Sequence, residues 1–292
     1  MKTFSPIAAA IIFAASGSVF AANNTAIQNQ VGVGNLQNAT QVGIGVDNNT
    51  IMQGQVGSFN VEVALQTADE NNSIIQQNQD GTANLATSTQ SGGAFNNASI
   101  TQVNEGNDGT TVQTVSVLSS ASIEQQGFFN VGLITQTQSL LDNANISQVG
   151  TSNTANILQS FSALNDANIN QVGTMNDADI SQTLLGNDAD IFQNGFMNVG
   201  NIIQVGLFNT ALKVQNGSFN LGDITQLGVG HIGLEFQTGD SNQALTTQTG
   251  LGHYSLTNQQ GEFNSHDTVQ LGVGETAMAT QIGTLNVGFI SQ

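Results

Sequence analysis

The sequence predicts an all-β protein, a cross-β solenoid of about 24 strand-turn units of 11–13 residues with two units in each rung. Three observations predict this fold. A short residue pattern recurs from end to end after the first 21 residues, and its fixed members fall on alternate positions. The only proline is Pro6, so no later residue lacks the backbone N–H that a strand ladder needs.

The repeat is clearest at residues 176–197, where the letters NDADI occur twice, eleven residues apart. Each copy has a glutamine at its seventh position, Gln182 and then Gln193, and this glutamine recurs every eleven residues as far as Gln292. Upstream, at spacings of eleven to thirteen, we place it at Gln171, Gln159, Gln148, Gln136, Gln125, Gln113, Gln102, Gln90, Gln77, Gln66, Gln53, Gln41 and Gln30. The repeat therefore covers residues 22–292 as one domain.

Four other positions of the unit are nearly constant. Asparagine lies six residues before the glutamine, alanine or glycine four before it, and isoleucine two before it in the middle of the chain. Glycine lies two residues after it. The unit N-x-A-x-I-x-Q-x-G-x-x has a two-residue period, which indicates a strand and not a helix. We expect the glycine to supply the left-handed or crowded backbone of the following turn.

A unit of eleven residues cannot bury its single inward face alone, so it must stack on copies of itself. We expect two consecutive units to make one flattened rung with the alanine and isoleucine positions facing each other inside. Equivalent residues of every second unit then lie above one another at ~4.8 Å, and twelve rungs give a rod of roughly 55–60 Å.

The candidate functional residues are the asparagines and glutamines of the repeat, whose side-chain amides we expect to stack in columns, one kind made of asparagine and one of glutamine. An amide both donates and accepts, so stacked amides satisfy each other, whereas each unpaired buried amide costs about 1–3 kcal/mol. Asp177, Asp179, Asp188 and Asp190 alternate with this inner face and should point to water. The predicted structural ladder comprises Asn153, Gln159, Asn165, Gln171, Asn176, Gln182, Asn187, Gln193, Asn198, Gln204, Asn209, Gln215, Asn220 and Gln226.

The first residues, 1–21, resemble an export signal. Lys2 is followed by an apolar run over residues 7–15 and by small residues around Ala21, where we expect cleavage at Ala21 or Ala22. No later stretch approaches the ~20 apolar residues of a membrane helix, so we expect a secreted chain that does not span the membrane.

Composition excludes several partners. The chain has 2 Lys and Arg against 20 Asp and Glu, a formal charge of −18, which repels nucleic acid and anionic lipid. Hydrophobic residues reach 38% and charged ones only 8%, which argues against disorder. Cysteine is absent, so backbone pairing must hold the structure without disulfides.

Signals for other functions are each explained by the repeat. Residues 228–233 match G-x-G-x-x-G, but their glycines occupy repeat positions and no helix is expected after them. His231 and His253 replace the leading asparagine and should stack, which leaves a shared metal ion as a minor alternative. Asp166 and Asp188 are the best candidates for calcium. We expect no catalytic, cofactor or metal residue, and no enzyme.

The doubled unit resembles the curlin repeat of the secreted amyloid subunits that form curli fibres, and it covers essentially all of residues 22–292. The resemblance implies a β-solenoid subunit, exported unfolded and polymerised at the cell surface as a pilus-like extracellular fibre that supports biofilm matrix and cell adhesion. It also implies three partners: other copies of the chain, a nucleator subunit, and an outer-membrane secretion channel with accessory factors. The acidic composition favours a major subunit.

The C-terminal repeats carry two further expectations. Gln292 is itself an anchor, preceded by Asn286, Gly288 and Ile290 in their repeat positions, so we expect both ends to be adhesive and growth to be open-ended. We also expect a looser C-terminal half, because the inner isoleucine is replaced by Lys213, Glu235, Thr246, Thr257 and Thr268.

The alternative function is that of a monomeric secreted binding module on the same fold, binding ice or another surface. Ice binding would need one outward column of uniform threonine. The residue before the anchor varies instead, which argues against ice: Ser181, Phe192, Ile203, Val214, Thr225 and Phe236.

Overall fold

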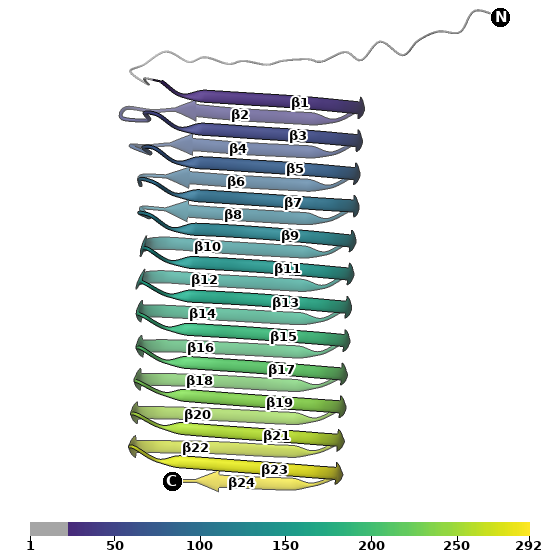
Figure 1. The fold of residues 1–292 in the computed structure, drawn as a ribbon, viewed down its shortest axis with the longest axis vertical. Helices are drawn as coiled ribbons and strands as arrows, with labels where there is room; N and C mark the ends of the chain where they lie inside the picture. The colour runs from purple at the N-terminus through teal and green to yellow at the C-terminus, as the bar shows by residue number, and fades with distance from the viewer. Residues whose placement is uncertain (1–22) are drawn as a thin grey trace, which may run out of the picture.

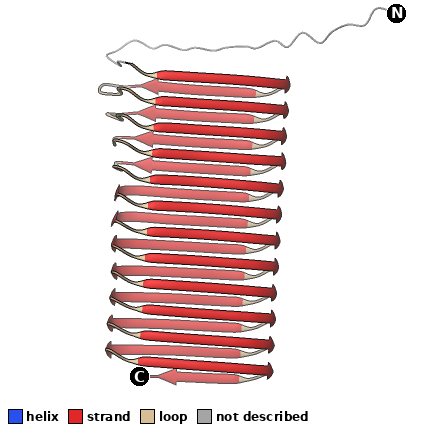
Figure 2. Ribbon diagram, viewed as in Figure 1, coloured by secondary structure: helices blue, strands red, loops and turns tan. Residues whose placement is uncertain are grey.

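Two flat sheets of twelve parallel strands each face one another in the computed structural model, which describes residues 23–292 (Figure 1). Strands fill nearly the whole of this part of the chain and short loops join them at both edges (Figure 2). No helix that could cross a membrane occurs within residues 23–292. The all-β solenoid of about twelve turns is thus confirmed, whereas the expected export signal at residues 1–21 lies outside the described residues.

Successive strands alternate between the two sheets. The odd sheet holds β1 (Thr25–Val33), β3 (Thr50–Ser58), β5 (Ile74–Thr82), β7 (Asn97–Glu105), β9 (Ser120–Phe128), β11 (Asn143–Thr151), β13 (Asp166–Thr174), β15 (Asp188–Phe196), β17 (Thr210–Ser218), β19 (Ile232–Asp240), β21 (Tyr254–Glu262) and β23 (Thr276–Thr284). The even sheet holds β2 (Leu36–Val42), β4 (Val61–Thr67), β6 (Leu85–Ser91), β8 (Asp108–Thr114), β10 (Val131–Leu140), β12 (Thr154–Ala163), β14 (Asp177–Leu185), β16 (Val199–Leu207), β18 (Leu221–Val229), β20 (Gln243–Leu251), β22 (Ser265–Val273) and β24 (Val287–Ser291).

Each strand pairs in parallel with the strand two places along the chain. In β11 and β13, for example, Ile146 lies beside Ile169 and Gln148 beside Gln171. Equivalent positions of every second unit therefore stand directly above one another, as the repeat predicts. Parallel pairing needs a crossover connection, and here the facing strand of the other sheet is that connection.

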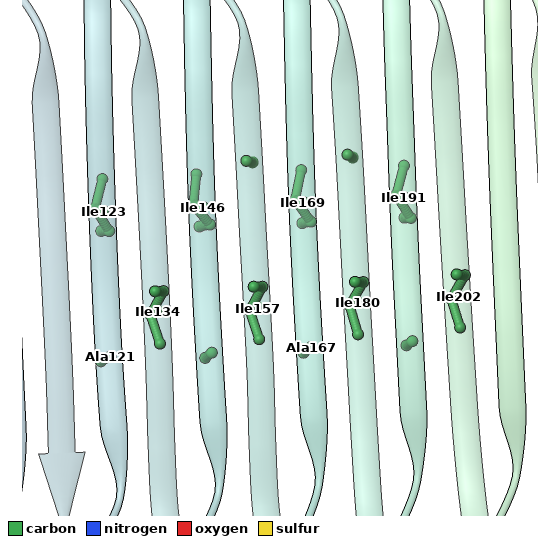
Figure 3. Packing of buried hydrophobic residues seen from close by; sticks show 14 of the residues in the cluster. Ala121, Ile123, Ile134, Ile146, Ile157, Ala167, Ile169, Ile180, Ile191 and Ile202 are labelled. Atoms are coloured by element: carbon green, nitrogen blue, oxygen red, sulfur yellow. The ribbon is translucent and has the colours of Figure 1, made fainter.

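The core is a single thin layer between the sheets. Ile123 of the odd sheet faces Gly132 of the even sheet, so closely that a Cβ on Gly132 would lie 3.1 Å from the Ile123 Cγ2 atom. Large residues of one sheet thus meet alanine or glycine of the other. Figure 3 shows the two isoleucine rows of the middle rungs, all fully buried: Ile123, Ile146, Ile169 and Ile191, and Ile134, Ile157, Ile180 and Ile202.

The turns use two backbone positions, of which the sequence indicated one. Gly150, two residues after its anchor, has φ +131°, and a Cβ there would lie 1.9 Å from the carbonyl oxygen of Gly173 in the next rung. No side chain fits such an approach. The residue before the leading asparagine is also left-handed, even where it is bulky, as in Phe129 (φ +56°) and Met175 (φ +57°). Its N–H donates to the previous rung, from Phe129 to the Glu105 carbonyl at 3.0 Å.

The structure corrects the register of two anchors near the N-terminus. Gln30 pairs with Gln55, and Gln55 in turn pairs with Gln79. Gln53 and Gln77, read from the sequence as anchors, instead occupy the column that holds isoleucine in later rungs. The cause is the longer turns of residues 43–49 and 68–73, where an even strand leads to the next odd one. Glutamine occurs in both columns there, so spacing alone selected the wrong one.

We predict that backbone amides after Gln204 exchange with solvent faster than those before it. Polar groups replace isoleucine in that part of the core, and the hydroxyls of Ser255 and Thr257 are buried without a hydrogen-bond partner within residues 23–292. Each such group costs about 1–3 kcal/mol, which lowers the free energy of local opening. Hydrogen–deuterium exchange resolved to peptides measures this, and slower exchange after Gln204 would contradict the prediction.

Candidate functional site

The anchor glutamines form two continuous hydrogen-bonded columns, one in each sheet. In every pair the Nε2 of one rung donates to the Oε1 of the next, as from Gln148 to Gln171 at 2.9 Å and from Gln159 to Gln182 at 2.9 Å. The odd column runs from Gln30 to Gln281 without a break, and the even column runs to Gln292. All donors point the same way, so each column has a direction.

The second N–H of each glutamine amide crosses the core. Gln148 Nε2 also donates to the Val131 carbonyl of the even sheet at 2.9 Å, and Gln159 Nε2 donates to the Asn143 carbonyl of the odd sheet at 3.0 Å. One side chain therefore joins neighbouring rungs and also joins the two sheets. Both donors of a fully buried amide are satisfied, which removes the cost of its burial.

Asparagines line the edge at which odd strands turn into even strands. Asn153 donates its backbone N–H to Asn130 Oδ1 at 3.1 Å, and its Nδ2 donates to the same oxygen and to the Gly173 carbonyl, both at 3.1 Å. The amide thus links the previous rung to the close-packed glycine of the next one. This column is uniform: Asn35, Asn60, Asn84, Asn107, Asn130, Asn153, Asn176, Asn198, Asn220, Asn242, Asn264 and Asn286.

The opposite edge is less uniform. Of the predicted ladder, Asn165, Asn187 and Asn209 lie here, and the Asn187 N–H donates to Asn165 Oδ1 at 2.8 Å. The Asn165 N–H donates to a carboxylate oxygen of Asp142 at 2.9 Å, while Asn165 Nδ2 is buried without a partner within residues 23–292. Burial raises the pKa of Asp142. The structure thus places the fourteen ladder residues in four columns, two of glutamine and two of asparagine.

Two histidines take the place of asparagine on this edge. The N–H of His253 donates to His231 Nδ1 at 3.2 Å, and the N–H of Glu275 donates to His253 Nδ1 at 3.2 Å. The two rings stack with centroids 4.9 Å apart and 4° between their planes. Each Nδ1 acts as the asparagine oxygen does, which requires a ring without a proton on that atom. Burial lowers the pKa of His231, with His253 adding to the shift.

The metal and nucleotide alternatives find no geometric support. Asp166 does pair with Asp188 in neighbouring rungs, as expected for the calcium alternative. Within residues 23–292, however, no group of three or more His, Cys, Asp or Glu side chains could hold a metal ion. The G-x-G-x-x-G letters at 228–233 run from the end of β18 through a two-residue turn into β19, a strand where the nucleotide motif requires a helix.

A buried ion pair replaces isoleucine in the odd sheet. Lys213 Nζ lies 2.8 Å from Glu235 Oε2, one rung away, and both side chains are fully buried. The facing sheet supplies room, because a Cβ at Gly222 would lie 2.6 Å from Lys213 Nζ. Burial lowers the pKa of Lys213 and raises that of Glu235, while their mutual attraction opposes both shifts. A shift of β19 along β17 would separate Lys213 from Glu235 and leave each buried charge unpaired, so the pair favours a single register.

Two carboxyl groups are buried near the N-terminal end, and the sequence analysis did not identify either. Glu62 takes the position of alanine, where Gln37 Nε2 donates to its Oε2 at 2.9 Å. Burial raises the pKa of Glu62 to about 8, with hydrogen bonds from Gln37 and Gly54 opposing the shift. Burial also raises the pKa of Glu70. Glu62 lies four residues before the anchor Gln66, the alanine position of the unit, so the repeat alone could have shown it as a carboxyl in an inward position.

The ends of the stack leave strand edges unpaired. Within residues 23–292, the outer edges of β1, β2, β23 and β24 pair with no other strand. The direction of the glutamine columns makes these ends different. Gln30 and Gln41 at one end present amide oxygens, whereas Gln281 and Gln292 at the other present N–H groups. The two ends are therefore chemically complementary.

Comparison with models of known protein families found no match to this chain, and comparison with curated proteins found no match either.

We predict that Gln159→Leu lowers the free energy of unfolding by roughly 2–4 kcal/mol. The change leaves the Gln136 amide, the Gln182 oxygen and the Asn143 carbonyl without their present partner in the core. Urea denaturation followed by circular dichroism measures the loss. Gln126→Leu is the matched control, because Gln126 is exposed and forms no side-chain hydrogen bond within residues 23–292. Equal effects of the two changes would contradict a role of the column.

We also predict that Glu62→Gln weakens the pH dependence of stability. The pKa of Glu62 is raised from its ordinary value of 4.5 to about 8, so its contribution to stability is fully present below pH 4.5 and is lost as the pH rises towards 8. Glutamine does not ionise, so the variant should be more stable at pH 7, by up to about 3 kcal/mol.

Urea denaturation between pH 4 and pH 9 tests this expectation, with the exposed Glu124→Gln as the control. If the curves of wild type and Glu62→Gln run parallel over that range, the carboxyl is not held protonated in the fold.

Proposed function

We propose that the chain is the structural subunit of an extracellular, curli-like amyloid fibre that grows by stacking copies end to end. The single observation that carries the proposal is the complementary chemistry of the two outermost rungs within residues 23–292. An unpaired strand edge of this length is a template for another chain, and soluble proteins usually block it with charge, proline or a covering segment. Here the repeat continues to the outermost strands.

Register supports a head-to-tail junction between copies. When β23 of one copy lies beside β1 of the next, Gln281 meets Gln30 and Gly283 meets Gly32, at the same positions as in the internal rungs. Gln281 Nε2 donates to the Ser265 carbonyl, and its second N–H, which has no partner within residues 23–292, then meets the Gln30 oxygen, which has none there either. A head-to-head junction would instead bring two sets of acceptors together, so the fibre should be polar.

The proposed role follows from this growth. Each added copy gains the same backbone and amide pairing as an internal rung, and so the fibre lengthens without a preferred size. We propose that the fibre forms at the cell surface, in the manner of the curlin repeats that the sequence resembles, and supports biofilm matrix and cell adhesion. Its proposed partners are copies of itself, a nucleator subunit, and an outer-membrane secretion channel with accessory factors.

We predict that the purified chain without residues 1–21 forms fibres with the cross-β reflections, near 4.7–4.8 Å along the fibre axis. Amyloid-dye fluorescence and fibre diffraction measure this. A chain that remains monomeric for days at high concentration would exclude the fibre.

The same preparation tests growth at the β24 edge. The backbone N–H of Phe289 points away from β22, because successive residues of a strand direct their N–H groups to opposite sides. Phe289→Pro removes that donor and should slow elongation, whereas Phe289→Ala should not.

A further inference from the structure

The outer face of the even sheet carries a regular array of hydroxyl groups. One outward column, just after the anchor glutamine, bears a hydroxyl in six successive even strands: Thr67, Ser91, Thr114, Thr137, Ser160 and Thr183. Two further columns complete a grid of nine positions on β6, β8 and β10. Seven of the nine are threonine or serine: Thr87, Thr89, Ser91, Thr110, Thr114, Thr135 and Thr137. Val112 and Leu133 fill the other two.

Neither the residue before the anchor nor a search for threonine alone reveals this array. The residues before the anchor, from Ser181 onward, alternate between the two sheets, and the column here includes serine, which carries the same hydroxyl group. The hydroxyl column lies on the other side of the anchor and in earlier rungs. It becomes visible only when every second unit is read as one sheet, because Thr114 and Thr137 are 23 residues apart and yet are neighbours.

The geometry of the grid is fixed. Neighbouring strands lie ~4.8 Å apart and alternate residues of a strand ~6.6 Å apart, which sets the spacing in both directions. Threonine is stiff at its first side-chain torsion, so its hydroxyl and methyl groups keep their positions. Figure 1 shows the strands of the even sheet lying nearly parallel down the stack, so the sheet has little twist from strand to strand. None of the seven hydroxyls forms a hydrogen bond to another group within residues 23–292.

Charge indicates what such a face can bind. The chain has 20 Asp and Glu, yet no charged residue occurs in these three columns from β4 to β12. Asp108, at the start of β8, is a carboxylate in the outward column beside this grid. The grid itself is uncharged on an acidic chain, which is complementary to an uncharged ligand. No aromatic residue occurs there either, and so the flat ring platforms on which sugar rings usually pack are missing from this face. The equivalent grid on β7, β9 and β11 of the odd sheet is mixed and includes Glu124.

We propose that this hydroxyl face binds the surface of ice. Each hydroxyl both donates and accepts, so the grid offers an ordered set of partners to a lattice of water oxygens, with the threonine methyl groups against the spaces between them. Single contacts of this kind are weak, but a rigid array engages many at once, which raises the combined affinity. Growth of a fibre along the stack leaves this face uncovered, so the binding does not depend on the fibre.

The test compares substitutions on the two faces. Thr114→Tyr with Thr137→Tyr places two bulky rings in the hydroxyl column. Gln126→Tyr with Val149→Tyr places the same rings at the equivalent positions of the odd sheet and is the control. Each chain is examined in soluble form and as fibres, by watching the shape of a single ice crystal, measuring the gap between freezing and melting, and measuring the protein taken up by growing ice.

We expect the wild type and the control to shape the crystal, open the gap and enter the ice, and the threonine variant to lose all three. Circular dichroism must show the same β signal in each. A second variant, Thr89→Lys with Thr135→Lys, should lose the same three effects on ice. It replaces the tyrosine variant in the test if that variant does not fold. The proposal is overturned if the wild type has no effect on ice, if both faces lose activity equally, or if the wild type binds crystalline cellulose or chitin and not ice.

Discussion

The structure depends on the need of buried side-chain amides for partners. A glutamine that points into a dry core has two donors and an acceptor to satisfy, and another glutamine directly above and below it, with one carbonyl across the core, satisfies them all. Only a parallel, in-register stack places like residues in this way. The in-register parallel pairing of both sheets follows from that requirement.

The two edges of the stack differ in how many hydrogen bonds their side chains make between rungs. On the odd-to-even edge an asparagine amide reaches both the previous asparagine and the glycine carbonyl of the next rung, so an inserted residue would break three contacts. That edge accordingly keeps a turn of two residues in all twelve rungs of residues 23–292. The other edge accepts longer turns near the N-terminus and also accepts serine, aspartate and histidine, because its contacts from rung to rung need only a backbone N–H and one acceptor.

The inner surfaces of the sheets fix the register of the stack, whereas the strand edges and the outer face are available for binding. The core is apolar in the middle rungs and polar towards both ends, where Glu62 and the Lys213–Glu235 pair are buried. These groups add little to stability, yet each fits only one position in the stack. Stacking of copies would use the strand edges, which lie along the axis, whereas the hydroxyl face lies across it. An end-to-end fibre and a binding face are therefore compatible in one chain.

The sequence by itself determined the fold class, the two-residue period and the columns from Gln171 to Gln292, because units of nearly constant length make the spacing unambiguous there. It also identified the isoleucine positions and the outward aspartates. The tertiary structure decided the register of Gln55 and Gln79, since turn length varies at one edge and glutamine occurs in two inward columns. It also decided which outward residues are neighbours, because a sheet face is assembled from every second unit and adjacency there depends on the length of the rung.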